Sequence, residues 1–360
     1  MSGNKQRLVV FFDGTWNDPQ DRTNVFRMCS CLADYDEEVP QRFFYDPGVG
    51  TSKLTRLQGG MFGTGLSKNL MEGYDWLARR YMEGDEIWVF GFSRGAYTAR
   101  SLVGLLRKCG LLHVSTPDLQ VAAEKLYRDK SAGPDDPPSE RFRRQYSREV
   151  KVYFIGVWDT VGSLGIPGTM ISERGLYSWH DTQLSKIVEH AYQAMALDEH
   201  RAPYDVVQWV GENGLKKPEN VDVEQRWFIG AHADVGGGYG DNPLADDNPL
   251  SDISLLWMQQ KAVAAGLKFV PVVPAPKAFK TEPHDSFREF AGGAYAVLRG
   301  VLHAGDGRFY RCFEQECKDS EGKVSRGVNV TVDPSVWQRW ASVPDYRPPT
   351  LVAANKSAPY

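Results

Sequence analysis

The chain has 360 residues, of which 42% are hydrophobic, and its formal net charge at pH 7 is -4. This size and apolar content favour one α/β domain with insertions over two independent domains. The small negative charge, without any basic tract, argues against nucleic acid as a partner. The five cysteines lack the spacing of zinc or redox sites, which fits reduced thiols in a cytosolic protein.

Strand and helix patterns alternate along the first two-thirds of the chain, as expected of a parallel sheet covered by helices. Strands are predicted, in chain order, at 8–12, 41–45, 86–92, 150–157 and 224–231. Helices are predicted at 24–33, 66–82, 96–109, 185–197 and 252–265. The last of these helices is expected to have Ser251 as its N-cap and to be closed by Gly266. The predicted fold class is α/β.

Two stretches interrupt this alternation. Residues 114–149 are polar and rich in proline, which favours a helical insertion with a surface loop. From residue 271 onward, proline and short strand-like pieces dominate. We therefore expect a catalytic domain over residues 1–270 and a C-terminal extension over residues 271–360 that packs on the same domain.

The hydrophobic runs are all short. The apolar run at 8–12 is too short for the core of a signal peptide, and no run approaches the length of a membrane span. These observations predict a cytoplasmic protein without a signal peptide or a transmembrane segment. Export by a route that needs no signal peptide, and peripheral contact with a membrane, are left open.

The pentapeptide Gly-Phe-Ser-Arg-Gly at residues 91–95 lies between the predicted strand at 86–92 and a predicted helix. Strand, G-x-S-x-G and helix in this order are the context of a nucleophile elbow. The turn is sharp, so small flanking residues are needed, and the two glycines meet this need. The turn would raise the Ser93 hydroxyl above the sheet and direct the helix N-terminus at a developing oxyanion. The non-catalytic alternative is a turn whose serine caps the helix.

A serine nucleophile needs a general base, and the base needs an acid that orients it. In α/β-hydrolases the acid and then the histidine follow the serine, each at the C-terminal end of a strand. Asp159 and His232 each follow a predicted strand in this order, so we expect Asp159 to be the acid and His232 the base. Three other residues remain candidates: His303 for the base, and Asp198 or Asp234 for the acid.

The oxyanion hole of such an enzyme requires two backbone N–H groups. One is expected from Arg94, the residue after the nucleophile, and the other from the loop after the strand at 8–12. The amide of Gly14 or Thr15 is therefore the second candidate, and an ordinary Asp-Gly turn is the alternative. Four aromatic residues flank the proposed site and either line an apolar substrate pocket or belong to the core: Trp16, Phe92, Trp158 and Tyr239.

Three other interpretations compete with the serine hydrolase. A haloacid-dehalogenase-type phosphatase would need an aspartate nucleophile where this chain has Phe11. A binding module that keeps the hydrolase scaffold is opposed by the complete Ser, Asp, His order. A metal-dependent phosphoesterase leaves the serine elbow unexplained, although its oxygen ligands and one histidine suit a divalent ion. Its ligands would be Asp13, Asp159, His232 and Asp234.

Five motifs together resemble one family. They are Phe-Asp-Gly-Thr-Trp-Asn at 12–17, Pro-Gly-Val-Gly-Thr at 47–51, Gly-Phe-Ser-Arg-Gly-Ala at 91–96, Val-Trp-Asp-Thr-Val-Gly at 157–162 and His-Ala-Asp-Val-Gly-Gly-Gly-Tyr at 232–239. They are similar to the α/β-hydrolase family that includes the catalytic domain of type VI secretion phospholipase effectors, and the resemblance covers roughly residues 7–265.

The resemblance implies an α/β-hydrolase with Ser93, Asp159 and His232 as its catalytic residues. It also implies carboxylic ester substrates, with phospholipid acyl esters as the best-known case. We therefore expect a serine hydrolase that takes an ester or a lipid as its substrate and needs no cofactor or metal. The sequence identifies no protein partner.

Overall fold

The structure is a computed structural model of the chain. It describes residues 5–14, 22–33, 39–48, 62–162, 183–239, 249–270, 278–293, 296, 306–318 and 322–358. Within this part of the chain, no helix combines the length and the apolarity that a membrane crossing requires.

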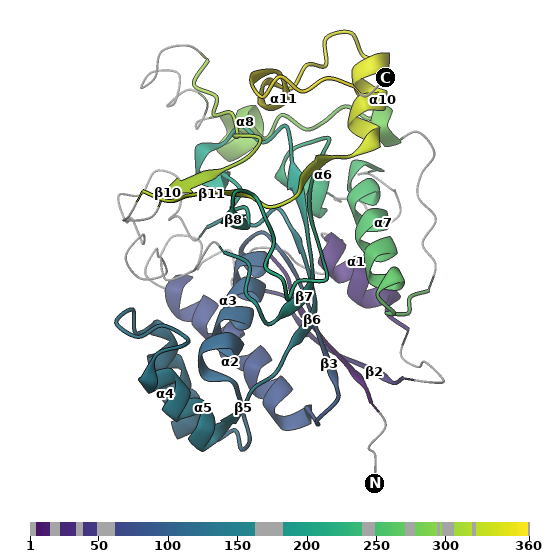
Figure 1. The fold of residues 1–360 in the computed structure, drawn as a ribbon. Helices are drawn as coiled ribbons and strands as arrows, with labels where there is room; N and C mark the ends of the chain where they lie inside the picture. The colour runs from purple at the N-terminus through teal and green to yellow at the C-terminus, as the bar shows by residue number, and fades with distance from the viewer. Residues whose placement is uncertain are drawn as a thin grey trace.

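A seven-stranded sheet forms the centre of the molecule, and all its neighbouring strands are parallel (Figure 1). The strand order is β12-β9-β7-β6-β3-β1-β2. The strands are β1 (Arg7–Phe12), β2 (Gln41–Asp46), β3 (Glu86–Phe92), β6 (Val152–Trp158), β7 (Val188–Ala196), β9 (Asp222–Phe228) and β12 (Val330–Val332).

The chain changes direction across the sheet at β1. Strand β2 lies on one side of β1, whereas β3 and the later strands of this sheet lie on the other. In open α/β sheets, ligands bind outside the carboxyl ends of the strands at this point of reversal. A site is therefore expected around the residues that follow β1 and β3.

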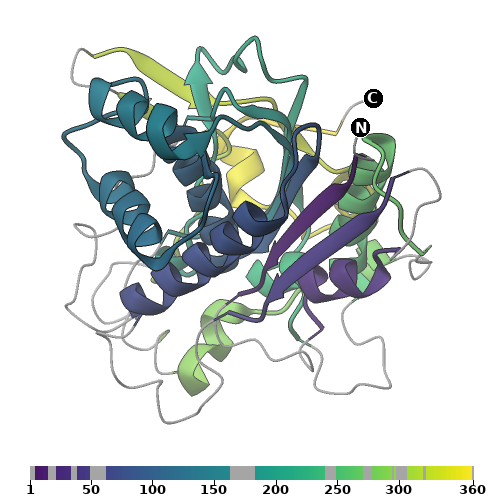
Figure 2. The ribbon, with the colours of Figure 1, turned by 90° about the horizontal axis from the view of Figure 1, so that it is seen from below.

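Helices cover both faces of the sheet (Figures 1 and 2). One face carries α2 (Phe62–Arg80), α3 (Arg94–Cys109), α4 (Pro117–Arg128) and α5 (Pro137–Tyr146), and the other carries α1 (Asn24–Cys31) and α7 (Pro249–Ala264). Helices α4 and α5 form the helical insertion that was predicted over residues 114–149. With its sheet and two helical layers, the molecule has the predicted α/β-hydrolase fold.

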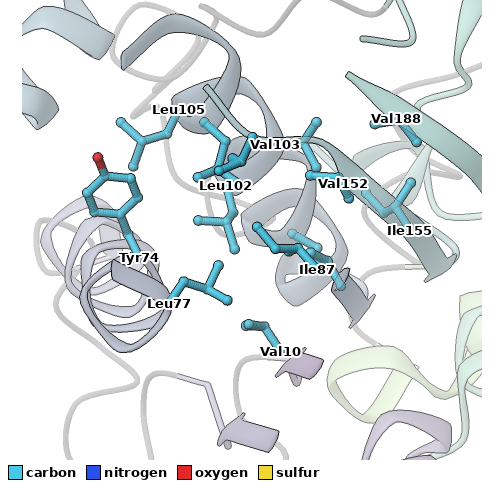
Figure 3. Packing of buried hydrophobic residues seen from close by; sticks show 14 of the residues in the cluster. Val10, Tyr74, Leu77, Ile87, Leu102, Val103, Leu105, Val152, Ile155 and Val188 are labelled. Carbon is cyan, nitrogen blue, oxygen red and sulfur yellow. The ribbon is translucent and has the colours of Figure 1, made fainter. Parts of the chain in front are cut away.

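Alternating side chains of the strands fill two separate cores. Leu8 and Val10 of β1 pack towards α2 and α3, whereas Val9 and Phe11 pack towards α1 and α7. This alternation is the period-2 geometry of a strand that is buried on both faces. Figure 3 shows the first core, where side chains of α2 and α3 meet those of β1, β3, β6 and β7.

The C-terminal residues contribute directly to the central sheet. Strand β12 pairs with β9 and forms one edge of the sheet. A third hydrophobic cluster contains Trp227 of β9, Val336 of α10 (Pro334–Ser342) and Leu351 of α11 (Pro349–Ala353). A small antiparallel sheet joins β8 (Val210–Glu212), β11 (Val324–Gly327) and β10 (Glu316–Lys318). The pair β4 (Leu111–Leu112) and β5 (Ser147–Arg148) lies beside the insertion. The boundary between a catalytic domain and an extension near residue 270 stays a prediction.

The predicted helix at 185–197 is wrong, because these residues contain strand β7 between β6 and β9. Alanines and Met195 give the segment a high helix propensity, which tertiary pairing overrides. Ala191 and Tyr192 point into opposite cores, as neighbouring residues of a strand do. The prediction of Ser251 as an N-cap is also wrong, because α7 already begins at Pro249.

Candidate active site

Ser93 occupies a strained turn between β3 and α3. Its backbone has φ 59° and ψ -120°, a conformation that few non-glycine residues adopt. A Cβ atom on Gly95 would lie 2.2 Å from the Phe12 carbonyl oxygen, and one on Gly91 would lie 2.5 Å from the Gly95 oxygen. Close backbone packing therefore requires both glycines, Gly95 against the end of β1 and Gly91 against the start of α3. The Ser93 hydroxyl makes no cap hydrogen bond to α3, which does not support the non-catalytic alternative.

Three side chains from the ends of three strands form a continuous hydrogen-bonded chain. Ser93 Oγ lies 2.8 Å from His232 Nε2, and His232 Nδ1 lies 2.5 Å from Asp159 Oδ2. All three residues are buried. An ionised carboxylate only accepts, so Nδ1–H donates to Asp159 and Nε2 is left to accept from the serine. The structure thus brings together the three residues that the sequence predicts as nucleophile, base and acid.

Asp159 directly follows β6 and has a positive φ of 41°. Its Oδ1 accepts from the amide of Ala196 at 2.8 Å, and both of its oxygens accept from Arg311, at 2.7 Å and 2.9 Å. Burial alone would raise the pKa of the Asp159 carboxyl, but the Arg311 charge and the His232 hydrogen bond hold this pKa below its ordinary range. Asp159 is therefore ionised at neutral pH.

His232 is the first residue of the short helix α6 (His232–Gly236), which follows β9 after three residues. Its ring contacts the rings of Phe92 and Tyr204, with centroids 4.7 Å and 5.2 Å away. Burial lowers the pKa of His232 below its ordinary value, although the Asp159 and Glu199 carboxylates act in the opposite direction. The imidazole is therefore neutral at pH 7 and able to accept a proton.

A second buried carboxylate, Glu199, supports His232 and escaped the sequence analysis. Glu199 accepts from the His232 backbone amide at 3.2 Å and from the Arg201 guanidinium at 2.8 Å and 2.7 Å. Burial would raise its pKa, but the Arg201 hydrogen bonds and charge lower the pKa of Glu199 to about 2. Glu199 follows β7, so the mistaken helix concealed the signal that would have revealed it, an acidic residue just after a strand.

Arg311 also went unnoticed in the sequence. It lies 152 positions after Asp159 along the chain, in a segment with no motif of its own. Nothing in the spacing of charged residues connects the two. Its place at the site is determined by how the C-terminal residues fold back over the ends of the strands.

The structure describes two of the three predicted oxyanion donors, Arg94 and Gly14. The Arg94 amide is at the first position of α3, next to the nucleophile. Asp13, which follows β1, is buried, and its carboxylate accepts from the Gly14 amide at 2.7 Å and from the Thr23 hydroxyl at 2.5 Å. The Gly14 N–H is therefore already engaged. Thr15 stays the predicted second donor, and it lies outside the described residues.

The four aromatic residues that flank the predicted site lie in different surroundings. Phe92 packs on the His232 ring, and Tyr239 is half-buried and stacks on His284 with ring centroids 3.8 Å apart. Of the two alternatives for Trp158, the structure places it in the core, because its side chain is fully buried on the side that faces α1 and α7. Trp16 lies outside the described residues.

The alternative acids bind other partners. The Asp198 carboxylate accepts from the Gly230 amide at 2.7 Å, and that of Asp234 accepts from the Ala231 amide at 3.0 Å. Neither is a hydrogen-bond partner of the His232 ring, whose Nδ1 partner is Asp159. The alternative base His303 lies outside the described residues.

The predicted metal ligands do not form a cluster. Among the residues that the structure describes, no group of three His, Cys, Asp or Glu side chains is placed to hold an ion. Asp13 is occupied by Thr23 and Gly14, and Asp159 by Arg311 and His232. The geometry therefore does not support the metal phosphoesterase.

A second histidine–aspartate pair ties the C-terminal part of the chain to α6. His284 Nδ1 lies 2.7 Å from Asp234 Oδ1, and Asp234 follows His232 by two residues. The hydrogen bond to Asp234 raises the pKa of His284 above its ordinary value. A raised folded-state pKa stabilises the protein fully below the unfolded pKa of about 6.5, and this contribution is lost as the pH rises through the folded pKa.

We therefore expect His284→Gln to lower the free energy of unfolding more at about pH 5.5 than at about pH 8.5. Urea unfolding of both proteins at the two pH values measures this difference. Subtracting wild type from variant removes the contribution of His232, whose lowered pKa acts in the opposite direction. A loss of stability that is equal at both pH values would contradict the prediction.

Comparison with known proteins gives a family and several distant relatives. Residues 6–261 match the family described as "T6SS, Phospholipase effector Tle1-like, catalytic domain". The chain is 30% identical over 229 residues to the uncharacterized protein YEL023C of Saccharomyces cerevisiae, and this match covers 56% of the chain and 32% of the yeast protein. The chain therefore spans about a third of that relative.

Solved structures show weaker similarity. An uncharacterized protein from Pseudomonas aeruginosa has a TM-score of 0.44 at 20% identity, and the match covers 76% of this chain and 48% of that one. The propionate-bound esterase Est2 from Thermogutta terrifontis has a TM-score of 0.40 at 15% identity, over 76% of this chain and 88% of its own.

The family match runs from the start of β1 into α7 and includes Ser93, Asp159 and His232. It confirms the resemblance that the five sequence motifs carry. The chain belongs to the family of type VI secretion phospholipase effector Tle1-like catalytic domains.

Proposed function

We propose that this chain is a serine hydrolase that cleaves carboxylic esters through Ser93, His232 and Asp159 by way of an acyl-enzyme. The observation that carries the proposal is the buried chain of two hydrogen-bond distances, 2.8 Å from Ser93 Oγ to His232 Nε2 and 2.5 Å from His232 Nδ1 to Asp159 Oδ2. Three residues that lie far apart in the sequence meet in the arrangement that activates a serine.

The proposed reaction has two halves. In the first, His232 Nε2 takes the proton of Ser93 as its oxygen attacks the ester carbonyl, and then gives this proton to the leaving alcohol. In the second, His232 activates a water that releases the acyl group from Ser93. Asp159 keeps Nδ1 protonated and stabilises the imidazolium, while the amides of Arg94 and Thr15 bind the oxyanion.

The proposed natural substrate class is the acyl ester of a phospholipid. The family description supports this class, since it names phospholipase effectors. The rings of Phe92 and Tyr204, which contact His232, give the reacting groups apolar neighbours. A lipid substrate would also involve contact of the protein with a membrane surface.

The test is a substrate screen in two steps. The first uses p-nitrophenyl esters of increasing acyl length, with rapid mixing to detect a burst of p-nitrophenol equal to the enzyme concentration, the sign of an acyl-enzyme. The second uses phospholipid micelles and measures fatty acid release. We expect ester turnover that needs no divalent ion. Turnover of phosphate esters that depends on a divalent ion, without turnover of carboxylic esters, would overturn the proposal.

A further inference from the structure

Arg311 forms a bidentate contact with Asp159, the proposed acid, through both terminal nitrogens of its guanidinium. Nη1 lies 2.7 Å from Asp159 Oδ1 and Nη2 lies 2.9 Å from Oδ2, and neither side chain is exposed to solvent. Two parallel N–H···O bonds fix a carboxylate in direction as well as in position. This fork therefore determines how Asp159 meets the ring of His232.

The two terminal nitrogens of Arg311 also bond to the backbone of the site. Nη1 also donates to the carbonyl of Ala196, at the end of β7, at 2.6 Å, and Nη2 donates to the carbonyl of Tyr204. Tyr204 is the residue whose ring stands against His232. Arg311 thus connects Asp159 to Ala196 at the end of β7 and to Tyr204 beside His232.

Arg311 lies outside the region that defines the family. The family match ends at residue 261, so the catalytic acid is held by a part of the chain that the match does not include. Arg311 is followed by residues that are anchored in the fold: the hydroxyl of Thr350 donates to the Arg311 carbonyl, and Phe313 packs against Trp227.

Charges around the triad come in opposite pairs, and Arg311 is the cation that contacts the acid. The Glu199 carboxylate, which also faces His232, is paired with Arg201. Asp234 of α6 is paired with His284. Burial raises the pKa of Tyr239 above its ordinary value, so its phenol carries no charge at neutral pH. Glu199 and Asp205 are two further carboxylates near Arg311, and burial raises the pKa of Asp205.

These positions determine in which direction Arg311 shifts the protonation of His232. A carboxylate favours the protonated form of a neighbouring imidazole, and a cation beside that carboxylate offsets part of the attraction. Arg311 therefore opposes protonation of His232. Without this cation, Asp159 would hold a proton on His232 up to a higher pH.

We infer that Arg311 is a positioning residue of the triad, which orients Asp159 towards His232 and extends to lower pH the range in which His232 acts as a base. This inference rests on the proposed function. It extends the catalytic machinery from the family region to the C-terminal part of the chain.

The experiment compares the pH dependence of kcat/KM for p-nitrophenyl acetate in wild type, Arg311→Met and Arg311→Lys. For Arg311→Met we expect the acid limb to move up by about one pH unit and kcat to fall about 10- to 100-fold as Asp159 loses its orientation. Arg311→Lys keeps the charge but not the fork, so its acid limb should stay in place while kcat still falls by about 10-fold.

Arg339→Met is the matched control. Arg339 is a second buried arginine in the C-terminal part of the chain, and it binds Glu282 and the carbonyls of Phe279 and Thr281 instead of the triad. It should leave the acid limb unchanged. An equal shift in Arg339→Met would overturn the inference, as would a folded Arg311→Met with the profile of wild type. If Arg311→Met does not fold, an unchanged kcat in Arg311→Lys overturns it.

A separate measurement keeps this inference distinct from the proposed function. Absence of ester turnover in wild type would count against the proposed function alone. The His232 titration can then be followed by NMR on protein with labelled histidine. The inference predicts that the ring titrates at higher pH in Arg311→Met than in wild type, and an equal titration would overturn it.

Discussion

Ser93→Ala is expected to lower kcat for ester hydrolysis by about 10⁴-fold or more while the protein stays folded. The substitution removes the only atom that can form the acyl-enzyme, so turnover falls to what the oxyanion donors and binding alone supply. Alanine keeps the backbone conformation at φ 59°, and the fold loses only the 2.8 Å hydrogen bond to His232. We expect a change in the free energy of unfolding of about 1 kcal/mol or less.

Ser101→Ala provides the matched control for this loss. Ser101 is a buried serine in α3, the helix that follows Ser93, and its hydroxyl donates to the Tyr97 carbonyl at 2.7 Å. This variant should keep wild-type turnover. The assay measures kcat on the best p-nitrophenyl ester, and urea unfolding checks the fold. Turnover close to wild type in a clean Ser93→Ala preparation would exclude Ser93 as the nucleophile.

Asp159→Asn should cost both activity and stability. An asparagine cannot stabilise the imidazolium and favours the wrong tautomer of His232, which in a Ser-His-Asp triad lowers kcat by about 10⁴-fold. It also leaves the buried Arg311 guanidinium without the carboxylate that it contacts, and turns an amide N–H group towards one of the Arg311 donors. Breaking a buried ion pair in this way costs about 3–5 kcal/mol of unfolding free energy.

The double variant Asp159→Asn/Arg311→Met separates these two losses. Removing the Arg311 cation should restore part of the free energy of unfolding, because replacing both members of a buried ion pair lowers stability far less than replacing one. Turnover should stay as low as in Asp159→Asn. Chemical unfolding and kcat measure the two quantities on the same preparations. Wild-type stability in Asp159→Asn would mean that the Arg311 contact contributes little to the fold.

The positions of the triad could be predicted because parallel strands bring their carboxyl ends to one edge of a sheet. Ser93, Asp159 and His232 follow β3, β6 and β9 directly or within a few residues, so the order of strands in the sequence was sufficient to bring them together. The glycine pattern around Ser93 carried similar information, because the turn has room for no other residue.

Other features of the site depend on contacts that local sequence does not record. Strand β7 consists largely of helix formers, and only its place between β6 and β9 makes it a strand. That error also concealed Glu199. Arg311 contacts Asp159 although it lies 152 positions later in the sequence, and no periodic pattern in the sequence predicts this contact. Trp158 is an aromatic residue next to the proposed site, which suits a pocket, but the alternation of side chains along β6 directs it into the core.

Labelling with a fluorophosphonate probe, followed by peptide mass mapping, tests the central claim most directly. The probe reacts with activated serines, so it reports on the triad without requiring the natural substrate. We predict a single adduct on Ser93 that is absent in Ser93→Ala, is formed much more slowly in His232→Ala and is unaffected in His303→Ala. A folded wild-type protein that takes up no probe, or that is labelled on another serine, would contradict the account.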